Sequence, residues 1–149
     1  MVNTLEAHLG YWLRFVSNHV SHAFSLKLAT REVTVAEWVV LRELYDRDAM
    51  APSELATRLG MTRGAISKLA DRLVAKSLLT RTSNDAGDRR FQALALTPAG
   101  RALTPELAVL ADQNDAEFFD HLEPEQRAVI EDAMKEIVQR RGLRTIPIA

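Results

Sequence analysis

The chain has 149 residues, 47% of them hydrophobic, and this length and composition suffice for one domain with its own core. It has no cysteine, which excludes disulfides, thiolate zinc sites and regulation by direct thiol oxidation. The sequence has no apolar run of membrane-spanning length and no signal-peptide pattern, so we expect a cytoplasmic protein without a membrane partner.

Charge is unevenly distributed along the chain. Residues 53–101 hold nine Lys and Arg against four Asp and Glu, a local net charge of +5, whereas the rest of the chain carries −6. A basic segment between acidic flanks indicates a local surface that faces phosphates.

The first third of the chain predicts two helices. Apolar residues recur in steps of three and four over residues 4–29, which predicts one long amphipathic helix. Thr34 followed three residues later by Glu37 is a capping-box pattern, so a second helix is predicted to begin there.

Some side chains of these two helices are candidates for a ligand site. Trp12, Trp38 and Arg42 are candidates to line an effector pocket in which Arg42 binds a carboxylate, although a tryptophan pair is more often plain core. His19 and His22 have a spacing that two metal ligands can share, but no third ligand stands near them in sequence. We therefore expect no metal and no cofactor.

A helix-turn-helix pattern follows. Pro52 fits the first turn of a third helix. Gly60 ends that helix and allows the left-handed backbone of a tight turn, and Thr62 caps a fourth helix that runs to about Lys76. The other offsets of the two-helix unit are occupied by Ala56, Ile66 and Leu69.

A β-hairpin is predicted next. Residues 78–82 favour a strand, residues 84–87 have turn chemistry, and residues 91–96 alternate as the returning strand. Thr97 as cap and Pro98 at the first helical position then predict a fifth helix.

Pro105 lies two turns inside this fifth helix. Proline lacks the N–H that would bond the carbonyl four residues earlier, and its ring crowds that carbonyl. We therefore expect a bend or a short break between Gly100 and Glu106, with Thr104 in a position to cap a restarted helix. Two roles for this bend stay open. It is either a hinge that couples effector binding to DNA binding, or a fixed kink without a role in switching.

The C-terminal segment carries more apolar surface than one small domain needs. A sixth helix is predicted after Pro124, ending near Gly142. The excess of apolar side chains favours a subunit interface. These side chains are Phe118, Phe119, Leu122, Ile130, Met134, Ile137, Ile146, Pro147 and Ile148.

Several of these motifs resemble those of one known family. The residues that carry the resemblance are Ser53-Glu54-Leu55-Ala56, Gly60, Asp88-x-Arg90, and Leu96-Thr97 followed by Gly100. In these marks the chain resembles the MarR family of winged helix-turn-helix transcriptional regulators. The resemblance implies a mainly α fold with a small β-hairpin wing (α+β), within a single chain 1–149. Residues 31–101 would form the winged helix-turn-helix DNA-binding region, and residues 1–30 and 102–149 the dimerisation helices.

The resemblance also implies a function. Such a chain is expected to be a homodimer that binds a pseudo-palindromic operator in double-stranded DNA, as a repressor released by a small aromatic or anionic effector. The sequence has no nucleophile–base pair, carboxylate dyad or phosphate-binding glycine loop, so we expect no catalytic residues and no enzyme. The alternative is a winged-helix protein-interaction or dimerisation module without specific DNA binding, and the basic middle segment argues against it.

The fourth helix is the expected reading helix, and it offers two kinds of DNA contact. Arg63, Ser67 and Lys68 are predicted to reach base edges, Arg63 through a two-pronged contact with guanine. Thr62 and Arg72 are predicted to meet phosphates, which position the protein rather than specify a sequence. The alternative is a solvated helix face with ordinary charges.

The tip of the predicted wing supplies three further candidates. By resemblance, Arg90, which follows Arg89, enters the minor groove, where narrow A·T stretches concentrate negative potential. Asp88 is predicted to brace Arg90 or Arg63 through a charge-assisted hydrogen bond, or else to be a turn-forming aspartate.

Overall fold

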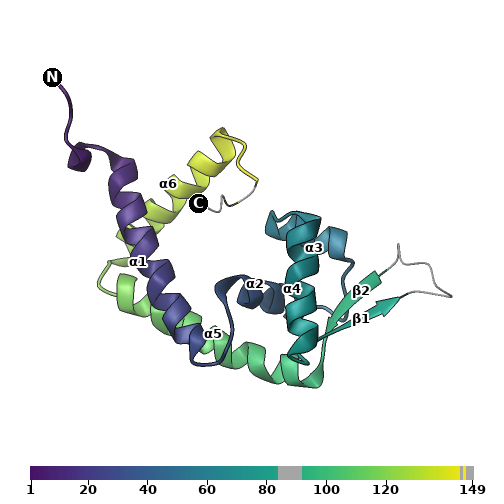
Figure 1. Ribbon diagram of the computed structural model, residues 1–149. Coiled ribbons are helices and arrows are strands. Elements are labelled where there is room, and N and C mark those ends of the chain that lie inside the picture. Colours follow the sequence, from purple (N-terminus) through teal and green to yellow (C-terminus); the bar gives the residue numbers. More distant parts are fainter. Residues whose placement is uncertain (84–91, 145, 147–149) are drawn as a thin grey trace.

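The computed structural model describes residues 1–83, 92–144 and 146 (Figure 1). Its elements in chain order are the 3₁₀ turn Leu5–Ala7, α1 (Leu9–Ala29), α2 (Val35–Tyr45), α3 (Pro52–Leu59), α4 (Arg63–Ala75), β1 (Leu79–Ser83), β2 (Gln92–Leu96), α5 (Pro98–Phe119) and α6 (Pro124–Arg140). Two arms result: α2, α3, α4 and the hairpin form one, α1 and α6 lie in the other, and α5 runs between them (Figure 1). The expected mainly α fold with a small hairpin is confirmed.

The N-terminal helix begins later than the sequence predicts. The expected single helix over residues 4–29 is wrong at its start, because His8 has extended backbone angles and separates a short 3₁₀ turn from α1. Two side chains contact carbonyl groups of this first turn: the His8 Nδ1 lies 3.1 Å from the carbonyl of Thr4, and the Trp12 indole donates to Glu6. These local contacts stabilise the turn in place of a continuous α-helix.

The signals for the next three helices are confirmed. The Thr34 hydroxyl accepts from the backbone of Glu37, and the Glu37 side chain accepts from Thr34 in return. Gly60 has φ of 65°, and the Thr62 hydroxyl accepts from the backbone of Ala65 at 3.1 Å. The three helices pack on one core, to which Leu41, Leu44, Leu55, Ile66 and Leu73 contribute fully buried side chains.

The hairpin is antiparallel and short. Leu79 pairs with Leu96 and Arg81 pairs with Leu94, and the backbone of Met50 forms two further hydrogen bonds with Leu94. Leu79, Leu94 and Leu96 are buried, so this face of the hairpin packs on the helical core. The predicted turn at residues 84–87 lies outside the described residues.

Helix α5 passes through Pro105 without interruption, so the expected short break is wrong. Thr104 is not the cap of a restarted helix; it is buried within α5, and its hydroxyl donates to the carbonyl of Gly100 at 2.8 Å. Leu107, one turn further, is fully buried against the core. Packing on both sides of the proline therefore outweighs the cost of the missing hydrogen bond.

Helices α1 and α5 are joined by a polar contact as well as by packing. The Asn114 amide is buried and donates to the carbonyl of Val20 at 3.1 Å. The Lys27 ammonium donates to Asn114 at 2.9 Å and to Glu117 at 2.8 Å. These bonds fix α1 along α5 and so position the second arm.

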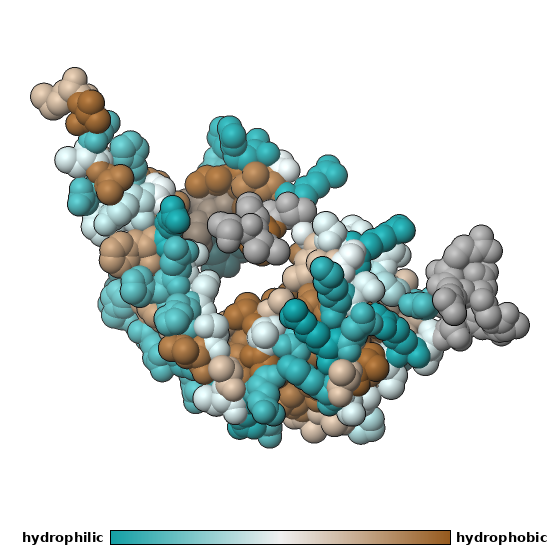
Figure 2. Space-filling view, in the orientation of Figure 1, coloured by the Kyte–Doolittle hydropathy of each residue, from teal (hydrophilic) through white to brown (hydrophobic). Residues whose placement is uncertain are grey.

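Helix α6 buries none of its residues within this chain. Its exposed apolar side chains include Ile130, Met134 and Ile137, each 46% exposed, and Trp12 and Phe15 of α1 are exposed to a similar degree. Figure 2 shows apolar residues at the surface of the arm that α1 and α6 form.

None of the described helices is long and apolar enough to cross a membrane.

Candidate nucleic-acid interface

Helix α4 has one buried and one exposed face. Ile66, Leu69, Ala70 and Leu73 face the core, as their spacing of three and four requires. The opposite face exposes the predicted DNA-contacting side chains Arg63, Ser67, Lys68 and Arg72. Among the ion pairs between described residues, none involves Arg63, Lys68 or Arg72. The structure therefore brings these predicted residues together on one open basic surface.

The N-terminal end of α4 is open to an approaching backbone. Its first turn has no acidic residue, so the partial positive charge of the helix end is not offset locally. A Cβ at Gly64 would meet only the hydroxyl of Thr62, at 4.0 Å. Thr62 itself is exposed, and its hydroxyl already accepts the capping hydrogen bond from Ala65. This end of α4 suits a phosphate or a base edge.

Strand β1 is tied to α4 by an arginine that sequence reasoning did not single out. The Arg81 guanidinium donates through Nη1 to the carboxylate of Asp71 at 2.5 Å and through Nη2 to the carbonyl of Ser67 at 3.1 Å. The signal available in the sequence was a charged residue at an inward position of a strand, on the same face as Leu79.

The predicted wing residues Asp88, Arg89 and Arg90 lie outside the described residues. Their roles, including the brace from Asp88 to Arg90 or Arg63, stay predictions.

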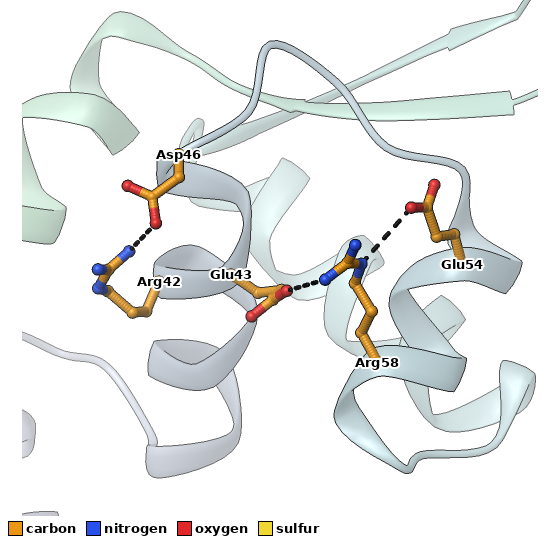
Figure 3. A network of polar contacts seen from close by, with 5 residues as sticks. All are labelled: Arg42, Glu43, Asp46, Glu54 and Arg58. Carbon is orange, nitrogen blue, oxygen red and sulfur yellow. Dashed lines mark hydrogen bonds and ion pairs between the residues drawn. The ribbon is translucent and has the colours of Figure 1, made fainter.

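Ion pairs of Lys76 and Arg58 orient the helices of this arm. The Lys76 ammonium at the end of α4 lies 2.8 Å from Oε2 of Glu37 at the start of α2. Arg58 of α3 lies between Glu43 of α2 and Glu54 of its own helix, at 3.6 Å and 3.5 Å (Figure 3). These ion pairs join α2 to both helices of the helix-turn-helix unit.

The expected effector pocket is not assembled within this chain. Trp38 packs edge-on against Phe24 of α1 with ring centroids 6.2 Å apart. Trp12 lies twelve residues before Phe24 on the same helix, or about 18 Å along its axis, and is exposed. Arg42 is exposed, and its guanidinium is paired with Asp46 at 2.8 Å (Figure 3). Periodicity assigns residues to a helix face but says nothing about their position along a pair of helices, so it could not separate Trp12 from Trp38.

The described residues contain no group of three or more His, Cys, Asp and Glu side chains that is arranged to hold a metal ion.

Known proteins share this arrangement. The family model "MarR family" matches residues 32–90. Multiple antibiotic resistance protein MarR of Escherichia coli (strain K12) is 26% identical over 131 residues, which cover 87% of this chain and 90% of that protein. A structure of a mutant E. coli MarR complexed with operator DNA is 25% identical, with a TM-score of 0.78, and covers 87% of this chain and 93% of that chain. The match of residues 32–90 and the similarity of most of the chain to MarR support a MarR-family winged-helix regulator.

Another solved structure is similar to this chain over most of its length. BpsR of Bordetella bronchiseptica, whose DNA binding is regulated by 6-hydroxynicotinic acid, has a TM-score of 0.81 and 26% identity, covering 91% of this chain and 98% of that chain. The HTH-type transcriptional repressor MdtR of Bacillus subtilis is 40% identical over 68 residues, which cover 46% of this chain and 43% of that protein. Similarity to known DNA-binding regulators therefore extends from the helix-turn-helix unit to the flanking helices.

Proposed function

We propose that this MarR-family chain is a homodimeric transcription regulator that binds a pseudo-palindromic operator in double-stranded DNA. It acts as a repressor that a small aromatic or anionic effector releases. The observation that carries this proposal is the open basic face of α4, with Arg63, Lys68 and Arg72 exposed beside a hairpin tied to the same helix. The complex of the similar E. coli MarR with operator DNA supports it.

Base reading is assigned to Arg63, Ser67 and Lys68, and phosphate contact to Thr62 and Arg72. Each of these side chains is exposed on or beside α4, which fits a helix inserted into the major groove. Asp88, Arg89 and Arg90 complete the proposed interface at the wing, on the strength of the family resemblance alone.

Dimerisation is assigned to residues 1–30 and 102–149, and DNA binding to residues 31–101. The apolar side chains that α6 and the first half of α1 expose would be covered by a second copy of this chain. In such a dimer the two α4 helices are expected to lie about one DNA turn apart, roughly 34 Å, which accounts for a pseudo-palindromic site.

DNA binding is tested by selecting duplexes from a random library with the purified protein. Affinity for a selected duplex and for a scrambled duplex of the same composition is then measured over a salt series. We expect preference for the selected duplex and a steep fall of affinity with salt, because phosphate neutralisation releases counterions. Affinity that is flat in salt, without any selected sequence, would instead indicate the protein-interaction module.

Effector binding is tested by thermal shift with a panel of aromatic acids that includes 6-hydroxynicotinic acid, the compound that regulates BpsR. A compound that binds the native dimer raises the unfolding midpoint and should lower affinity for the selected duplex. Trp38 and Arg42 of α2 remain the proposed pocket residues, with Trp12 contributed across the dimer. Arg42→Ala should abolish the shift, whereas Arg31→Ala, which removes an exposed ion pair elsewhere, should not.

A further inference from the structure

Arg81 occupies an unusual place for a charged residue. It is the central residue of β1, and its partner across the hairpin is Leu94, which is fully buried. Residues directly opposite each other in an antiparallel pair project to the same face. Arg81 therefore lies on the core-side face of the hairpin, in line with Leu79, rather than on the outer face with Thr80.

The guanidinium contacts two successive turns of α4. Nη1 donates to Asp71 and Nη2 donates to the carbonyl of Ser67, four residues earlier. One planar fork thus holds two points on one side of the helix, which a lysine ammonium cannot reproduce in that geometry. Its side chain is only 32% exposed, whereas that of Asp71 is 64% exposed.

The contact lies among the residues proposed to read DNA. Ser67 is itself one of them. Lys68 follows Ser67 in the chain, and Arg72 follows Asp71. A carboxylate on this face would repel phosphates, and the guanidinium of Arg81 compensates its charge. The pair therefore adds no net charge to the DNA-facing surface, while its two hydrogen bonds fix the hairpin against α4.

We infer that Arg81 is a positioning residue for sequence recognition, which locks the wing to the reading helix through Asp71 and Ser67. The inference rests on the proposed DNA-binding function. The wing and α4 then meet DNA as one rigid unit, so that the base contacts of α4 and the wing contacts are made in a fixed register. Loss of the lock lowers discrimination between the operator and other sequences more than it lowers general affinity for DNA.

The test compares Kd for a duplex selected by the wild-type protein with Kd for a scrambled duplex of equal composition. Arg81→Lys keeps the charge and removes the fork, and Arg81→Ala removes both. The discrimination is the Kd for the scrambled duplex divided by the Kd for the selected duplex, called the Kd ratio. We expect both variants to reduce this ratio by about threefold to tenfold, and the salt dependence of binding to stay the same. If Arg81 were a phosphate ligand, Lys would preserve binding and Ala would reduce the salt slope by about one, which would overturn the inference.

Substitution of Asp71 provides an independent test of the same inference. Asp71→Asn should also reduce the Kd ratio, and Arg81→Ala combined with Asp71→Ala should cost no more than Arg81→Ala alone, because one lock is lost in each case. An Asp71→Asn variant that binds both duplexes more tightly and keeps the ratio would contradict the lock. Arg31→Lys, in the exposed pair between Arg31 and Glu106, is the matched control and should change nothing.

Folding and function are separated by two checks. Thermal melts establish that each variant is folded, and hydrogen exchange of residues 79–83 and 92–96 in the free protein should be faster in Arg81→Lys than in the wild type. Unchanged exchange together with an unchanged Kd ratio would reject the lock while the proposed function stands. A wild-type protein that selects no duplex would reject the proposed function, and with it the inference.

Discussion

The Lys76 ammonium lies 2.8 Å from Oε2 and 3.1 Å from Oε1 of Glu37, and it also donates to the carbonyl of Glu32 at 2.6 Å. Glu37 is the third residue of α2, where its side chain completes the capping box with Thr34, and it is only 1% exposed, whereas Lys76 is the C-cap residue of α4. One carboxylate therefore closes the first turn of α2 and holds the far end of the reading helix.

This relationship predicts a pH-dependent contribution to stability. Burial raises the pKa of Glu37, but the Lys76 contact and the hydrogen bonds from Thr34 outweigh burial, so the pKa lies below its ordinary value of 4.5. The stabilisation is therefore complete above the unfolded pKa and is lost as the pH falls through the folded one. Glu37→Gln should cost about 1–3 kcal/mol at neutral pH.

Urea unfolding at several pH values checks this. The difference in unfolding free energy between wild type and Glu37→Gln should shrink as the solution is acidified below pH 4.5. Glu136→Gln, in an exposed pair with Arg140, is the control and should track the wild type throughout. A difference that is constant with pH would show that the ion pair contributes nothing.

The close approach of Gly100 to the backbone of Leu78 predicts that one methyl group added at Gly100 lowers stability strongly. A Cβ at Gly100 would lie 2.3 Å from the carbonyl oxygen of Leu78, which already accepts a hydrogen bond from Thr97. Gly100→Ala should therefore destabilise the protein by about 1–3 kcal/mol, since backbone must shift. Gly64→Ala, where a methyl group has room, should instead raise the melting temperature slightly. Equal melting temperatures for the two variants would contradict this account.

The exposed face of α4 predicts two classes of DNA-binding variant. Arg63→Ala and Lys68→Ala should relax base preference, by about 1–3 kcal/mol per lost contact, because they remove base-edge hydrogen bonds. Arg72→Ala should weaken binding to all sequences equally and reduce the salt slope by about one. Fluorescence anisotropy on single-base variants of a selected duplex measures both, and identical profiles for the two classes would show that the division of roles is wrong.

Arg90→Ala carries the prediction for the wing. By the family resemblance its side chain enters the minor groove, so affinity should fall most for duplexes with A·T-rich flanks. Competition between duplexes that differ only in their flanks measures this. A uniform loss across flanks would instead assign Arg90 to phosphate contact.

The exposed apolar side chains of α6 predict that a charge placed among them prevents dimerisation. Met134→Glu or Ile137→Glu places a charge where a second copy is expected to pack, and should yield a folded monomer with much reduced DNA affinity. Sedimentation at micromolar concentration distinguishes monomer from dimer. Lys135→Gln, on the same helix and 66% exposed, should remain dimeric. A wild-type protein that sediments as a stable monomer would refute the dimer itself.

The continuity of α5 predicts that Pro105 costs stability. Pro105→Ala should raise the free energy of unfolding, by up to about 3 kcal/mol, because it restores an N–H donor inside a continuous helix. The same variant tests the hinge. Unchanged DNA affinity and unchanged effector response would assign Pro105 a fixed structural place rather than a role in switching.

Much of the helix-turn-helix arm was predictable because its signals are local. The caps at Thr34, Thr62 and Thr97 each use a hydrogen bond to a backbone group three residues later, so sequence spacing alone specifies them. The end of α3 at Gly60 was predictable for the same reason, because the positive φ of this one residue forms the turn. The exposed basic face of α4 follows from its apolar period, since the remaining positions must face outward.

The sequence by itself therefore determined the order of helices and hairpin, their caps, and which face of α4 is open. Only the tertiary structure decided how the elements are held together. Arg81 and Asp71 are ten residues apart and Glu37 and Lys76 thirty-nine, and no short-range pattern pairs such partners. The tertiary structure also decided that α5 continues through Pro105. Burial of Thr104 and Leu107 in a shared core outweighs the preference of one proline to end a helix, because packing free energy is summed over many contacts.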